Sequence, residues 1–277
     1  MGSDEKEYLE LEEYQETSFE RTLKRTNLPL KEPMLPLIHK ADSVKDLERD
    51  KLTALDYLIS GIIPVVPCKV FGEDLAYTYI GRPAYRELTE PVCFILKPEP
   101  ELLQNIFLFD TGAYYGDRYR RIIDEGLDID LFRIPADRES VIRFIECYYG
   151  TNENYLLSHS VNVNEFSERE SEEEFAYLLL EHIRTFNDLD FDERCRTLEN
   201  ILRTPISLQT YLQGIILPRT LRENEKVAPF CDKNSGNIDI MTYDDIAEYT
   251  TPVDRNNAVD EILFRYYQEK GYISYEV

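Results

Sequence analysis

Three stretches of the chain carry polar side chains beside apolar runs, in places that packing alone does not explain. In the first, His39 follows the apolar run 34–38, which reads as a strand. We expect a histidine at such a strand end to be exposed, where its imidazole can contact a ligand. The plain alternative is a histidine that only hydrogen-bonds a neighbouring loop.

The second stretch, residues 77–86, combines three tyrosines and two arginines. Tyr79 and Tyr85 are candidates to stack on a planar ring, while Arg82 and Arg86 are candidates to grip a phosphate or a carboxylate. The same pattern also suits a structural corner in which arginine pairs with one of the many acids. Both interpretations stay open at this point.

Acidic side chains near apolar runs form the third group. Asp110 and Thr111 follow the run 106–109 in an Asp-Thr-Gly sequence, which presents a carboxylate and a hydroxyl where a strand ends. Aspartic proteases use this sequence, but they need two facing copies and this chain contains one. Glu199 lies in the strand-like run 197–202, where it would project from a sheet or simply face solvent.

Strand and helix patterns alternate irregularly along the chain that must position these groups. The expected strands are 34–38, 62–67, 91–98, 106–109, 197–202 and 214–218. The expected helices run from Asp42 or Ser43 to Gly61, around 119–123, from 141 to Gly150, over 175–186, and from 258 to Gly271. We therefore expect an α+β fold with a mixed, mainly antiparallel sheet, flanking helices and a partly helical C-terminal portion.

The polar residues 1–32 are expected to form an arm or helix, and 33–277 a single domain. Residues 151–174 are hydrophilic and acidic, which makes them a candidate mobile insert in that domain.

Charge and missing signals narrow the class of protein. The 54 acidic and 31 basic side chains leave a net charge of -23, which disfavours nucleic acid and anionic membranes as partners. No glycine-rich nucleotide loop, serine-hydrolase elbow or histidine-based metal motif occurs. Five scattered cysteines and no long apolar run predict a cytoplasmic protein without a membrane span.

The order of these residues resembles the His–Tyr–Glu arrangement of ADP-ribosyltransferases of the diphtheria-toxin and poly(ADP-ribose)-polymerase type. The resemblance covers about residues 35–216 and implies NAD as substrate. It implies that His39 holds the NAD ribose, Tyr79 or Tyr85 stacks on nicotinamide, and Glu199 steadies the transition state. Arg82 would meet the NAD phosphates. The pattern departs from the family at residue 41, where an alanine stands in place of the usual small hydroxyl residue.

The acceptor implied by this resemblance is a protein, a small molecule or water, and toxins and phage-defence effectors are the biological settings. Two other classes stay open. One is a non-enzymatic acidic module that binds a basic partner. The other is a nuclease-like or phosphate-handling enzyme that uses Arg82, Arg86 and Asp110.

Overall fold

The computed structural model describes residues 11, 13, 29–44, 52–83, 88–115, 129–157, 193–245 and 251–274. Tyr85 and Arg86 lie outside these residues. So do the helices expected around 119–123 and over 175–186, most of the N-terminal arm, and residues 158–174 of the expected insert.

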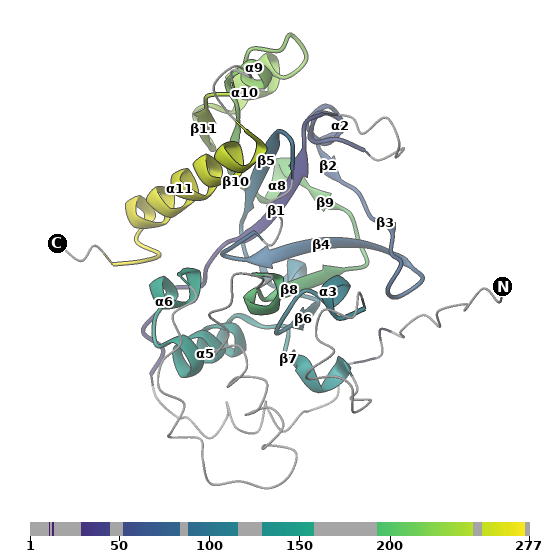
Figure 1. The fold of residues 1–277 in the computed structure, drawn as a ribbon, viewed down its shortest axis with the longest axis vertical. Coiled ribbons are helices and arrows are strands. Elements are labelled where there is room, and N and C mark those ends of the chain that lie inside the picture. The colour runs from purple at the N-terminus through teal and green to yellow at the C-terminus, as the bar shows by residue number, and fades with distance from the viewer. Residues whose placement is uncertain are drawn as a thin grey trace, which may run out of the picture.

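A large mixed sheet forms the centre of the fold (Figure 1). Among the described residues its strands are β1 (Leu37–Asp42), β3 (Val66–Pro67), β4 (Asp74–Ile80), β5 (Pro91–Leu96), β6 (Asn105–Phe107), β7 (Arg133–Ile134), β8 (Glu199–Leu202), β10 (Leu212–Pro218) and β11 (Asp239–Tyr243). The order is β11-β10-β5-β1-β4-β8-β6-β7, with β3 beside β4. Within this order β10 and β11 are parallel and the other pairs are antiparallel. Strands β2 (Ile62–Ile63) and β9 (Ile206–Ser207) form a separate antiparallel pair.

Helices flank the sheet, which confirms the predicted α+β class. They are α2 (Ala54–Ser60), α3 (Thr111–Tyr115), α5 (Arg138–Tyr149), α6 (Asn152–Leu156), α8 (Leu208–Tyr211), α9 (Arg219–Arg222), α10 (Ala228–Asn234) and α11 (Pro252–Lys270). Short 3-10 turns occupy Pro100–Leu102, Ile129–Phe132 and Glu193–Arg196. The long α11 is the C-terminal helix that the sequence predicts.

Local sequence explains where the helices end. Gly61 and Gly271 close α2 and α11 with positive φ angles of 73° and 74°, and Gly150 closes α5. The start of α2 differs from the prediction, because Thr53 caps it in a capping box rather than Asp42 or Ser43. Asp42 instead ends β1, and its carboxylate accepts hydrogen bonds from the backbone of Val44, Thr89 and Glu90 at 2.8–3.2 Å.

The two faces of the sheet carry different packing. Helix α11 covers one face, where Val259, Leu263 and Tyr267 pack against Ile38 and Ile95. Helix α2 lies on the other face, where Tyr57 meets Phe94 of β5. Helices α5 and α6 lie at the other end of the molecule from α9 and α10 (Figure 1).

The first part of the expected insert is packed into the protein. Thr151 caps α6, and Tyr155 within this helix has no exposed surface. Asn152 is also buried and donates to the carbonyls of Pro33 and Tyr272, both at 2.9 Å. Residues 151–157 therefore belong to the folded domain.

Candidate functional site

Four of the predicted site residues meet in one buried cluster. Tyr79 of β4 lies directly opposite Glu199 of β8 in the antiparallel register, although they are 120 residues apart in sequence. The Tyr79 hydroxyl donates to Asp110 Oδ2 at 3.0 Å and lies 3.5 Å from Glu199 Oε1. Thr111, at the start of α3, completes the cluster. One phenol hydroxyl thus joins two carboxyl groups.

In each carboxyl group, the oxygen that does not contact Tyr79 accepts hydrogen bonds from other donors. Thr111 donates to Glu199 Oε2 through its backbone N at 2.9 Å and its hydroxyl at 2.7 Å. The backbone N of Ala113 donates to Asp110 Oδ1 at 3.0 Å. These bonds hold α3 against β8, because the residues that start the helix are the residues that bind the carboxyl groups.

The cluster is closed to solvent. Glu199 and Asp110 are each 1% exposed, Tyr79 is 2% exposed and Thr111 is fully buried. Burial, together with the nearby charge of Asp110, raises the pKa of Glu199 well above its usual range, and the hydrogen bonds from Thr111 and Tyr79 offset only part of this.

The raised pKa of Glu199 favours its protonated form. The Tyr79 hydroxyl has one hydrogen, which it gives to Asp110. Its contact with Glu199 Oε1, at 3.5 Å, is the longer of the two. A neutral Glu199 beside Asp110 avoids two buried like charges.

The ends of β4 and β8 beside this cluster are tied together by Tyr155, which the sequence analysis did not single out. Its hydroxyl donates to the Ile80 carbonyl at 2.9 Å and accepts from the Leu198 backbone N at 3.0 Å. Its only sequence signal was an aromatic residue in a hydrophilic stretch, four residues after the N-cap Thr151.

Arg82 lies next to this tie and is only 7% exposed. Its Nη1 donates to the Tyr155 carbonyl at 3.3 Å, so in the structure the guanidinium supports α6. The preceding Gly81 has a φ of +69°, and a Cβ there would lie 2.5 Å from Leu35 Cδ1. The turn after β4 therefore requires a glycine at position 81.

His39 does not join the cluster. It lies inside β1 rather than at its end, because β1 continues to Asp42. Its neighbour Ile38 is paired with Tyr79, and successive side chains of a strand point to opposite faces. His39 therefore lies on the opposite face of the sheet from Tyr79 and Glu199, and the prediction of an exposed strand-end imidazole is wrong.

The surroundings of His39 are those of a packed side chain. Its Nδ1 is 2.7 Å from the Tyr77 carbonyl, and its ring lies 5.7 Å from the Tyr57 ring and 6.1 Å from the Phe94 ring. Burial lowers its pKa, which favours the neutral ring with Nδ1 as the donor. Its Nε2 is buried and has no hydrogen-bond partner among the described residues.

Other predicted groups do not join the cluster. Tyr77 lies on the same face of β4 as Tyr79, but its hydroxyl donates to Cys68 Sγ at 2.5 Å. Tyr85 and Arg86 lie outside the described residues.

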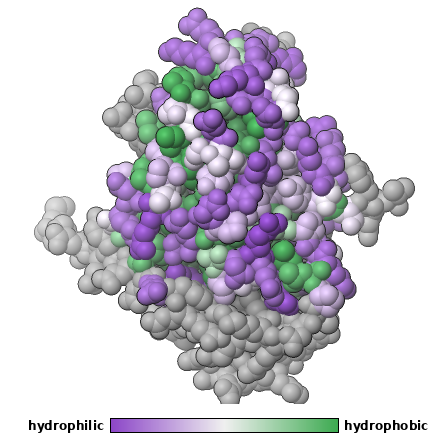
Figure 2. Space-filling model, turned by 180° about the vertical axis from the view of Figure 1, so that it is seen from behind, coloured by the Kyte–Doolittle hydropathy of each residue, from purple (hydrophilic) through white to green (hydrophobic). Residues whose placement is uncertain are grey.

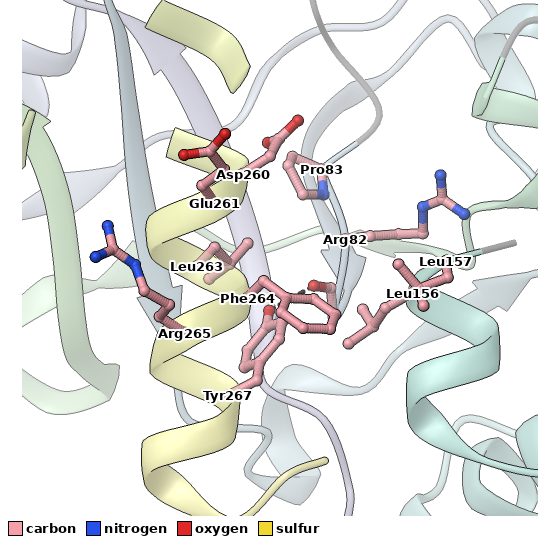
Figure 3. A pocket seen from close by; sticks show the side chains of 11 residues that line it. Arg82, Pro83, Leu156, Leu157, Asp260, Glu261, Leu263, Phe264, Arg265 and Tyr267 are labelled. Carbon is pink, nitrogen blue, oxygen red and sulfur yellow. Dashed lines mark hydrogen bonds between the residues drawn. The ribbon is translucent and has the colours of Figure 1, made fainter. Parts of the chain in front are cut away.

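A cavity of about 600 Å³ lies beside the end of β4 (Figure 3). Its walls come from the turn after β4, from the end of α6 and from the middle of α11, and include Gly81, Pro83, Leu156, Asp260, Phe264 and Tyr267. The cavity therefore borders the strand end that follows Tyr79. The α11 residues were not among the predicted site residues, although Asp260, Phe264 and Tyr267 recur at helical spacing.

Within the described part of the chain, no group of three or more His, Cys, Asp or Glu side chains could hold a metal ion. Over the same residues, no helix has the length and apolar character needed to cross a membrane. Comparison with known proteins found no matching family model, no matching curated protein and no matching solved structure.

Proposed function

We propose that the chain is an NAD-consuming enzyme of the ADP-ribosyltransferase type, with Tyr79, Asp110 and Glu199 at its centre. The observation that carries the proposal is the contact of one tyrosine hydroxyl with two buried carboxyl groups from separate parts of the sequence. Pairs of acids with shifted pKa values are common in active sites. The order of Tyr79 and Glu199, the two members of the His–Tyr–Glu resemblance that meet in the cluster, supplies the substrate class.

In the proposed chemistry Glu199 carries a proton and Asp110 carries the negative charge. Cleavage breaks the bond between the ribose C1′ and the nicotinamide nitrogen, and the electron pair leaves with nicotinamide. The anionic carboxylate of Asp110 stabilises the positive charge that develops on the ribose. The neutral Glu199 donates a hydrogen bond that orients the sugar, and Asp110 then takes the proton of the attacking acceptor.

Substrate entry requires an opening of the cluster, since its side chains are at most 2% exposed. Thr111 covers Glu199 through two hydrogen bonds. Movement of α3 away from β8 would break both bonds and uncover the two acids. This proposal assigns no role to His39, because that residue lies on the other face of the sheet.

The test is release of nicotinamide from NAD, followed by chromatography. Wild-type protein should release it, whereas Glu199→Ala and Asp110→Asn should reduce the rate by at least about a hundredfold. Glu225→Gln is the matched control, because Glu225 is an exposed glutamate remote in sequence from these residues, and its rate should be unchanged. A wild-type protein that neither releases nicotinamide nor gains thermal stability with NAD refutes the proposal.

A second candidate function is a non-enzymatic module that binds a basic partner. The burial of Tyr79 and Glu199 and the net charge of -23 favour it. Hydrophilic residues cover much of the described surface in the view from behind (Figure 2). Under this hypothesis NAD has no effect, and the chain binds a lysine-rich probe peptide with an affinity that falls steeply as salt is added.

A further inference from the structure

Helix α11 presents one stripe of side chains to the cavity beside β4. Asp260, Phe264 and Tyr267 are spaced by four and three positions, so they lie on the same side of the helix. Figure 3 shows this stripe facing Leu156 of α6, whereas Arg265 points away from it. The stripe sets the chemistry of the cavity.

The middle of the cavity is apolar and aromatic. The Phe264 ring extends from α11 toward Leu156, with Leu263 behind it (Figure 3). Tyr267 is fixed below, because its hydroxyl hydrogen-bonds to the Gly81 carbonyl. A flat ring that entered between α11 and α6 would find an aromatic face on one side and aliphatic side chains on the other.

The far end of the cavity is polar. Asp260 lies there beside Pro83, and its side chain is 30% exposed. Its Oδ1 is 3.3 Å from Nζ of Lys40, whose side chain has no exposed surface. The buried lysine holds the carboxylate in position, and a carboxylate accepts hydrogen bonds.

We propose that this cavity binds a planar heteroaromatic ring that carries an exocyclic amino group, such as a nucleobase. The ring packs against Phe264, and the amino group donates to the carboxylate of Asp260. A volume of about 600 Å³ accommodates a nucleoside. This site is separate from the carboxyl pair, and the inference does not rest on the proposed cleavage of NAD.

Adenosine is the probe, because it has the amino group but lacks the bond that NAD cleavage would break. Calorimetric titration of the full chain should show saturable binding. Purine riboside, which lacks the amino group, should bind about tenfold more weakly, since the carboxylate then loses its donor. Phe264→Leu and Asp260→Asn should each weaken adenosine binding to a similar degree, by about three- to tenfold.

Two controls separate this site from the carboxyl pair and from misfolding. Glu269→Gln changes an exposed residue of the same helix and should bind adenosine as wild type does. Glu199→Gln should also retain adenosine binding, whatever happens to nicotinamide release. Absence of saturable adenosine binding overturns the inference. Equal binding of purine riboside, or full binding by both cavity variants in their folded state, overturns it as well.

Discussion

Replacing Glu199 by glutamine should change how the stability of the protein depends on pH. Burial and Asp110 raise the pKa of Glu199 above its usual value of 4.5, so the folded protein binds this proton more tightly than the unfolded chain does. The free energy of unfolding must therefore fall as pH rises above about 4.5, until the folded pKa is passed. Glutamine has no such proton.

The size of the effect follows from proton linkage. The contribution from Glu199 has a slope of at most about 1.4 kcal/mol per pH unit. Between pH 5 and pH 7, the wild type should lose up to about 2.7 kcal/mol that the variant retains. Glutamine can also keep the contacts, because its oxygen accepts from Thr111 and its amide donates to Tyr79.

The assay is urea unfolding followed by far-ultraviolet circular dichroism at several pH values. The difference in unfolding free energy between Glu199→Gln and wild type should grow with pH. Asp110→Asn should narrow the pH range over which Glu199 lowers the stability, because it removes the second largest cause of the raised pKa of Glu199. Glu225→Gln should follow the wild type.

Parallel pH profiles for wild type and Glu199→Gln would refute the reasoning. They would mean that Glu199 is ionised in the folded protein at neutral pH.

Three further substitutions test the structure around the site. Gly81→Ala should destabilise the protein by about 2–4 kcal/mol, because the residue has a positive φ and a Cβ there would clash with Leu35. Gly236→Ala should change the stability little, because open space surrounds that residue. The midpoints of urea unfolding measure both effects. Tyr155→Phe should cost about 1–3 kcal/mol by the same assay, since the Leu198 N–H loses its bond to the Tyr155 hydroxyl and the Ile80 carbonyl keeps only its bond from the Arg82 N–H. Tyr211→Phe, at an exposed hydroxyl, should cost almost nothing. The pKa of His39 is lowered in the folded protein, so the unfolded chain binds this proton more tightly and the protein loses stability as pH falls below about 6.5. His39→Gln should therefore flatten the decline in Tm on the acid side. An unchanged decline contradicts this.

Part of the secondary structure was readable from the chain. The apolar run before Pro98 is the fully buried β5, and the pattern around Leu263 is α11, closed by Gly271 as predicted. These features are local, because hydrophobic periodicity and glycine stops act over one or two turns. Thr53 was missed as a cap because several polar residues upstream of α2 could serve equally well.

Part of the candidate site was also predictable. Tyr79, Asp110, Thr111 and Glu199 were selected as polar groups beside apolar runs, and the structure brings them together. Their burial was not foreseen, because the residues that cover a strand come from elsewhere in the chain.

The sequence by itself determined the α+β class, the acidic character and several of the polar groups that lie beside apolar strands. Only the tertiary structure decided which of these groups meet. His39 and Tyr79 belong to neighbouring strands, yet a register that pairs Ile38 with Tyr79 sends them to opposite faces. Register depends on contacts between distant segments, and a shift of one residue would reverse the outcome. No local pattern encodes that choice.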